Sequence, residues 1–138
     1  MKKNEIQNSA DLLLYKAIVD FNSATALFQM FEKNEIDIDI EKIYFDLQQS
    51  AEKLIKSILT KNKIVFKKTH DIENLIYTAK ENNINLMENI MELVDLNDYA
   101  VEGRYDIICD DIEDSSRYFL LISNLIKFVE TNNKINIS

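Results

Sequence analysis

The most regular pattern of apolar positions in the chain runs from Ile40 to Leu59. Apolar side chains recur there at intervals of three, four and one residue, the spacing of one stripe along an α-helix of about six turns. A stripe this broad can face several neighbours at once, so we predict a central helix around which the others pack. Its members are Ile40, Ile43, Tyr44, Leu47, Ala51, Leu54, Ile55, Ile58 and Leu59.

A second broad apolar face predicts a helix that begins at Asn8 or Ser9 and includes Leu14, Ala17, Ile18, Phe21, Ala24, Leu27, Phe28 and Phe31. The short segment Glu32–Asp37 joins it to the central helix. Asp37 or Asp39 can accept hydrogen bonds from the free N–H groups at the start of that helix. Because the link is short, we expect the two helices to be antiparallel.

Two further helices are predicted in the middle of the chain. Thr69 or Asp71 should cap a short helix that ends at Asn82 or Asn83 and buries Ile72, Leu75, Ile76 and Ala79. Asn85 and Glu88 form a capping-box pattern that should open a fourth helix, with Leu86, Ile90, Leu93, Val94 and Tyr99 facing inward. Gly103 either ends this helix, because glycine accepts a left-handed conformation, or lies within a longer one.

Asp110 and Glu113 can open the last predicted helix, which ends near Thr131. Its apolar positions are Tyr118, Phe119, Leu121, Ile122, Leu125, Ile126 and Val129. These patterns together predict an all-α fold, an up-and-down bundle of about five helices in a single domain over residues 1–138.

Composition supports this fold class. One glycine and no proline leave few of the residues that build tight β-turns. The formal charge of −8 repels polyanions at long range, so broad nucleic-acid binding is not expected. Lysines nevertheless gather at Lys53, Lys56, Lys61, Lys63, Lys67 and Lys68, where they form either a solvated helix end or a local face for a phosphate or an acidic partner.

Three segments resemble the HEPN domain family. Residues 45–59, Phe-Asp-Leu-Gln-Gln-Ser-Ala-Glu-Lys-Leu-Ile-Lys-Ser-Ile-Leu, are similar to the second helix of that family, and Lys68–Ile72 resembles its "THDL" turn. Asn97–Tyr105 is similar to its "YYxExRYP" segment, with Asp106 where proline is common. The resemblance implies a four-helix-bundle-like HEPN fold. It also allows a polar groove on the second helix, where the family's polar positions match Gln48, Gln49, Glu52 and Lys53.

Two residues are candidates for chemistry. His70 is the only histidine and therefore the only side chain whose ordinary pKa lies near neutrality, although the resembling family uses this turn structurally. Catalytic HEPN proteins are metal-independent RNases with an Arg-x4–6-His motif, and Arg104 could supply the arginine. The positions for the histidine, however, hold Cys109, Asp110 and Asp111.

The missing histidine makes RNA cleavage an unfavoured hypothesis, since a positioned general acid or base contributes about 10²–10⁴-fold in rate. Arg104 and Tyr105 could instead bind an anion or a partner's carboxylate. The acidic run Asp106, Asp110, Asp111, Glu113 and Asp114 is interpreted as solvated charge at a helix start rather than as a metal site. We expect no cofactor.

The resemblance implies a non-catalytic HEPN-like binding module, with Gln48, Glu52, His70, Arg104 and Tyr105 as its ligand or partner site. Such proteins associate with a minimal nucleotidyltransferase, as substrate-binding subunit or in a toxin–antitoxin pair, which makes a nucleotide a candidate ligand. A homodimer is expected. The alternatives are a divergent endoribonuclease that combines Arg104 with His70, and an oligomeric bundle with a structural role only.

The single cysteine, Cys109, suits a reducing compartment. Glu5 and Asp11 interrupt what would be the apolar core of a signal peptide, and no uncharged run approaches the ~18 residues that span a bilayer. We therefore expect a cytoplasmic protein without a membrane association.

Overall fold

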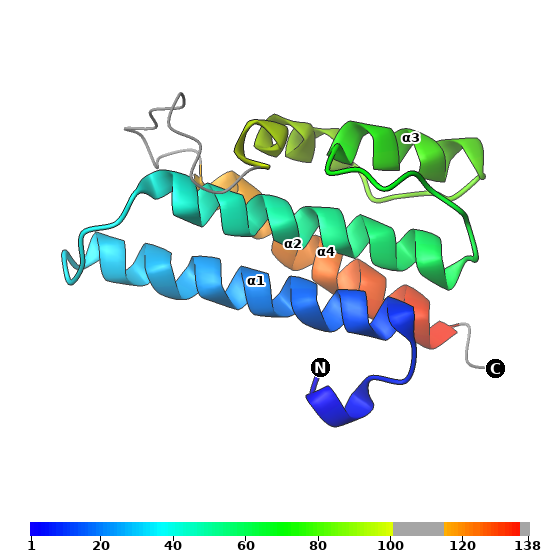
Figure 1. Cartoon of the computed structure of the whole chain (residues 1–138), viewed down its shortest axis with the longest axis horizontal. Helices are drawn as coiled ribbons and strands as arrows, with labels where there is room; N and C mark the ends of the chain where they lie inside the picture. The colour runs from blue at the N-terminus through cyan, green and yellow to red at the C-terminus, as the bar shows by residue number, and fades with distance from the viewer. Residues whose placement is uncertain (101–114, 136–138) are drawn as a thin grey trace.

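The computed structural model describes residues 1–100 and 115–135, with side chains as far as residue 132. Within these ranges every regular element is helical, which confirms the all-α prediction (Figure 1). The α-helices are α1 (Ser9–Glu32), α2 (Ile40–Lys61), α3 (Ile72–Glu81) and α4 (Ser115–Ile135). Two 3₁₀-helices, η1 (Lys3–Glu5) and η2 (Ile90–Tyr99), accompany them.

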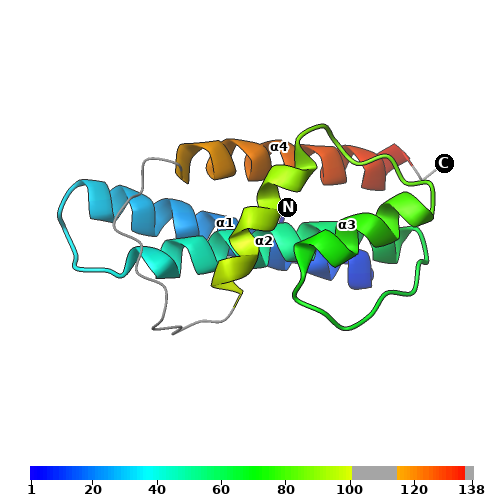
Figure 2. The same ribbon diagram turned by 90° about the horizontal axis from the view of Figure 1, so that it is seen from above.

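The predicted central helix is α2. It contacts α1, α3, η2 and α4, and fourteen of its 22 residues are buried, including the whole predicted apolar stripe. Helices α1 and α4 both run along α2 (Figures 1 and 2), whereas η2, seen from above, crosses the axis of α2 (Figure 2). No described helix is long and apolar enough to cross a bilayer.

Small side chains bring α1 and α2 close together as an antiparallel pair, as the short link predicts (Figure 1). Ala10, Ala17 and Ala24 of α1 are buried at intervals of seven residues. The buried Ser50 and Ser57 of α2 are also seven residues apart, and they face these alanines in antiparallel order. Ser57 Oγ donates to the carbonyl of Ala10, and Ser50 Oγ donates to the carbonyl of Ala17, each at 2.8 Å. We call this contact the alanine–serine seam.

The first three α-helices start at the predicted positions. Asn8 precedes α1 and accepts from the Asp11 N–H at 2.8 Å, and Asp71 precedes α3 and accepts from the Glu73 N–H at 2.9 Å. Asp39 holds the position before α2, but its carboxylate makes no capping hydrogen bond. For α2 the predicted position is therefore correct and the predicted cap bond is wrong.

The predicted α-helix opening at Asn85 is wrong. Residues 84–87 are irregular, Asn89 is left-handed with φ 67°, and a 3₁₀-helix starts at Ile90. Its buried residues Ile90, Leu93 and Leu96 are three apart, the repeat of a 3₁₀-helix rather than of an α-helix. The capping-box pattern at Asn85 therefore predicted the wrong type of helix, because the buried residues that follow it do not have the period of an α-helix.

The last predicted helix is present as α4 and continues past Thr131 to Ile135. All of its predicted apolar positions are buried except Phe119, which is partly exposed and packs against the core. Phe119 lies edge-on to Phe21, with ring centroids 5.9 Å apart, and so joins α4 to α1. Gly103, Asp110 and Glu113, predicted to act at helix ends, lie outside the described residues.

Replacing Ala17 by leucine should destabilise the protein, because three extra carbon atoms must enter the alanine–serine seam, where Ala17 is fully buried. We expect the free energy of unfolding to fall by about 1–3 kcal/mol. Gln29→Leu, at an exposed position of the same helix, is the control and should change it by less than about 0.5 kcal/mol. Urea unfolding at one protein concentration measures the free energy of unfolding of both variants. An equal change in the two variants would contradict close packing in the alanine–serine seam.

Candidate functional site

Three of the five predicted site residues meet between α2 and the turn that precedes α3. Gln48 and Glu52 are one helical turn apart on α2, and His70 comes to them from the connecting segment. The imidazole Nδ1 of His70 lies 2.9 Å from Glu52 Oε1, and its backbone carbonyl accepts from Gln48 Nε2 at 3.0 Å. Whether these residues bind a ligand or a partner stays a prediction.

Glu52 is the electrostatic centre of this group, because its side chain is only 4% exposed. A buried carboxylate is costly unless it is paired and hydrogen-bonded. Lys56 Nζ donates to Glu52 Oε2 at 3.2 Å while His70 contacts the other oxygen, so both carboxylate oxygens have a partner. A carboxylate oxygen only accepts, so the fitting imidazole tautomer carries its proton on Nδ1.

Hydrogen bonds hold the turn itself from several sides. Thr69 Oγ1 accepts from the Asp71 N–H at 3.0 Å. Asn97, at the end of η2, accepts from the Ile72 N–H at 3.0 Å and donates to Asp71 Oδ1 at 2.8 Å. The segment 69–72 is thus a structural junction of α2, α3 and η2, which agrees with the structural use of this turn that the resemblance implies.

The outer edge of His70 is what this site offers to another molecule. Its side chain is 68% exposed, whereas Gln48 is fully buried and has its amide in contact with the His70 carbonyl. With Nδ1 turned to Glu52, Nε2 is the ring nitrogen left to face outward. The site is therefore a surface built on a buried carboxylate.

A cavity of about 300 Å³ lies elsewhere, next to the end of α3. Its lining comes from Lys80 and residues 84–91. None of the predicted site residues borders it, so the cavity and the polar group at Glu52 are separate features.

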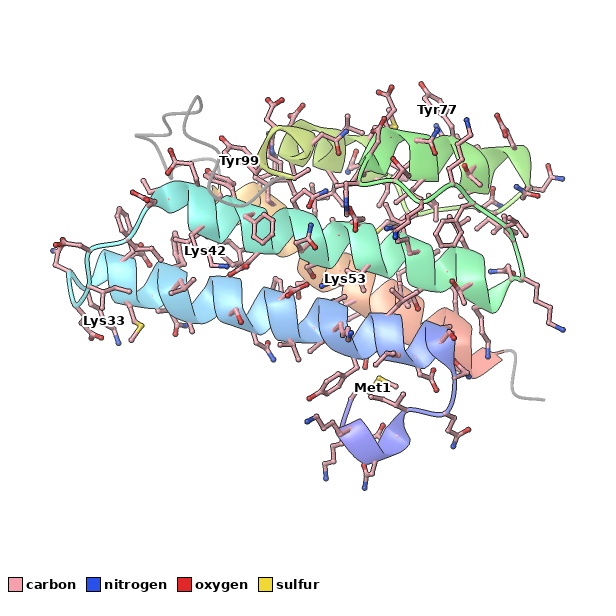
Figure 3. The ribbon with its side chains drawn as sticks, viewed as in Figure 1. Met1, Lys33, Lys42, Lys53, Tyr77 and Tyr99 are labelled. Atoms are coloured by element: carbon pink, nitrogen blue, oxygen red, sulfur yellow. The ribbon has the colours of Figure 1, made fainter. Side chains whose placement is uncertain are left out.

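A second cluster joins α2, η2 and α4, and sequence reasoning missed it. Tyr44 stacks on Tyr99 with ring centroids 4.8 Å apart and meets Tyr118 edge-on at 6.1 Å (Tyr99 is labelled in Figure 3). Arg117 Nη2 donates to the Tyr118 hydroxyl at 2.9 Å, and that hydroxyl lies 3.3 Å from Asp95 Oδ2. Burial raises the pKa of Tyr118. The tyrosines appeared in sequence only as core positions of separate helices.

The remaining predicted site residues, Arg104 and Tyr105, lie outside the described residues. So do Cys109 and the acidic run Asp106, Asp110, Asp111, Glu113 and Asp114. Within the part of the chain that the structure describes, no three potential metal-ligating side chains come together.

In a comparison with known protein families, the model described as "HEPN domain" matches residues 10–132. The matched range begins in α1 and ends in α4. Comparison with curated proteins and with solved structures gave no match.

Removing the buried carboxylate should destabilise the fold. In Glu52→Ala the Lys56 ammonium, only 15% exposed, loses the carboxylate oxygen it donates to. We expect the free energy of unfolding to fall by about 1–3 kcal/mol, the range for leaving a buried polar group without its partner. Glu81→Ala, at the exposed end of α3, is the control and should stay within about 0.5 kcal/mol of the parent in urea unfolding. A Glu52→Ala protein as stable as the control would contradict the pairing.

Proposed function

The chain belongs to the HEPN domain family, and from this premise we propose that it is a non-catalytic HEPN-like binding module that associates with a minimal nucleotidyltransferase. In such a complex it serves as the substrate-binding subunit or as one component of a toxin–antitoxin pair. The main observation in support of the proposal is the position of His70, the only histidine in the sequence. Its imidazole contacts the buried Glu52 of α2, and it lies in the turn that joins α2, α3 and η2.

The catalytic form of the family places a histidine five to seven positions after its arginine. After Arg104 those positions hold Cys109, Asp110 and Asp111. An acid or base of ordinary pKa near neutrality is therefore missing from the motif, and two carboxylates would repel an approaching phosphodiester. This supports a role in binding rather than in RNA cleavage.

The outward face of α1 supports a homodimer as the form of the module. Leu12 and Val19 are each 42% exposed and Met30 is 39% exposed, on the same helix whose alanines face α2. Leu12, Val19 and the exposed Ala26 follow one another at intervals of seven residues. A straight helix places such positions along one side, so α1 presents apolar groups both to α2 and to solvent. A second copy of the chain would cover this side.

Association with a nucleotidyltransferase is tested with the reading frames next to the gene. Co-expression with a neighbouring minimal nucleotidyltransferase should give a complex that survives purification at micromolar concentration. His70→Ala should weaken this complex by about tenfold, since the loss of one exposed contact of about 1.4 kcal/mol changes the dissociation constant tenfold. Affinity co-purification followed by titration calorimetry measures both.

Two results would count against the proposal. One is the failure of the two purified proteins to associate at micromolar concentration. The other is RNA cleavage by the purified chain that is lost in both His70→Ala and Arg104→Ala, which would favour the endoribonuclease.

Val19→Glu should shift the chain from dimer to monomer, because the charge would have to be buried between two copies of α1. It should leave the fold intact, since the Val19 side chain is already exposed in a single copy. Sedimentation equilibrium and circular dichroism measure the two effects.

Tyr77→Glu is the matched control. Tyr77 is 47% exposed and lies on the outer side of α3, across α2 from α1 (Figure 3). The control should keep the oligomeric state of the parent, and dissociation by the Tyr77 variant alone would place the interface on α3 instead.

A further inference from the structure

The stretch between Glu52 and Asp71 differs in charge from the rest of the chain. It contains six lysines and no Asp or Glu, in a protein whose formal charge is −8. The lysines are Lys53, Lys56, Lys61, Lys63, Lys67 and Lys68. Positive charge is therefore concentrated at the end of α2 and in the segment that follows it.

The structure divides these lysines into two groups. Lys53 pairs with Asp20 across α1 and α2 at 2.6 Å, and Lys56 pairs with Glu52 at 3.2 Å (Lys53 is labelled in Figure 3). The other four lie within residues 61–68, which we call the basic strap, and have no ion-pair partner among the residues that the structure describes. The charge of the basic strap is thus not neutralised from within the fold.

The backbone of the second half of the basic strap, residues 65–68, is also unpaired among the residues that the structure describes. Ile64 N–H still bonds to the Leu59 carbonyl, but within the described residues the N–H and C=O groups of residues 65–68 make no hydrogen bond to the protein. Exposure alternates over residues 64–67: Ile64 and Phe66 pack against the core, while Val65 is 94% exposed and Lys67 is exposed. Lys68, which is also exposed, ends the alternation. Side chains that alternate with period two indicate an extended chain, and free backbone groups along it resemble the edge of a β-sheet.

We propose that the basic strap binds an acidic, extended segment of a partner protein, which adds to residues 65–68 as a paired β-strand. The strand would take up the free backbone groups, cover the exposed Val65 side chain, and place carboxylates next to Lys63 and Lys67 on the same face. Lys68 adds positive charge at the end of the strap. This inference does not depend on the proposed nucleotidyltransferase, because any partner with such a segment satisfies it.

A protein strand fits these observations better than a nucleic acid. The strap carries lysines alone, without the arginines or exposed aromatic rings on which single-stranded bases stack, and its one aromatic residue, Phe66, packs against the core. The net charge of −8 also opposes the approach of a long polyanion. Binding of a nucleic acid would also leave the exposed Val65 side chain without a contact, whereas an added strand covers it.

The test uses three probes: a fluorescein-labelled peptide Glu-Thr-Val-Thr-Glu-Thr-Val-Thr-Glu, whose glutamates and valines share one face of a strand, the same peptide with every second amide N-methylated, and a uridine 12-mer. The full chain should bind the first peptide, and the methylated peptide, which cannot complete the ladder, should bind at least about tenfold more weakly. Fluorescence anisotropy at low and at high salt gives the affinities, and binding should weaken with salt.

The variant Lys63→Gln/Lys67→Gln/Lys68→Gln should weaken peptide binding by about tenfold or more. The matched control Lys2→Gln/Lys3→Gln/Lys33→Gln removes the same charge at exposed lysines elsewhere and should bind as the parent does. Lys33 follows α1, at the end of the bundle away from the strap (Figure 3). Circular dichroism confirms that both are folded.

Each of three outcomes would overturn the inference: no binding of the unmodified peptide at millimolar concentration, equal binding of the methylated peptide, or tighter binding of the uridine oligomer than of the peptide. Equal loss of binding in the two lysine variants would also overturn it, because it would show an effect of net charge rather than of the strap.

Discussion

The buried polar side chains of α2 each require a hydrogen-bond partner, and the arrangement of the bundle depends on this constraint. Five lie at or below 5% exposure: Asp46, Gln48, Ser50, Glu52 and Ser57. An unpaired polar group at such depth costs about 1–3 kcal/mol. The serines bond to backbone carbonyls of α1, Gln48 bonds to the turn before α3, and the two carboxylates bond to lysines one turn away. Apolar burial draws the helices together, and these bonds favour one arrangement over others.

The same constraint determines what is left for function. Glu52 and Gln48 have their polar groups engaged within the fold, so the exposed edge of His70 is the accessible part of that site. Among the residues that the structure describes, the outer side of α1 and the basic strap are two surfaces without a partner in a single chain, one apolar and one positively charged. A family member that works through association would need such surfaces more than it would need a cleft.

Sequence reasoning succeeded where burial repeats along one element, as in α2, whose whole predicted stripe is buried. It failed at η2. The cap pattern at Asn85 suggested an α-helix, whereas the buried apolar residues that follow are three apart and fit a 3₁₀-helix. It named Gln48, Glu52 and His70 as site residues, but their contact joins positions 18 residues or more apart and needs the turn geometry. The Tyr44, Tyr99 and Tyr118 cluster was missed for the same reason, since each tyrosine looks like an ordinary core residue in its own helix.

The alanine–serine seam also bears on the order in which the chain assembles. It joins two helices that are consecutive in sequence and separated by only seven residues, so closing this hairpin costs less chain entropy than docking α4 against either helix. Once formed, the hairpin already presents most of the α2 surface that the later elements cover. The seam thus leads us to expect that residues 9–61 form the nucleus for folding, onto which α3, η2 and α4 are added as synthesis of the chain proceeds.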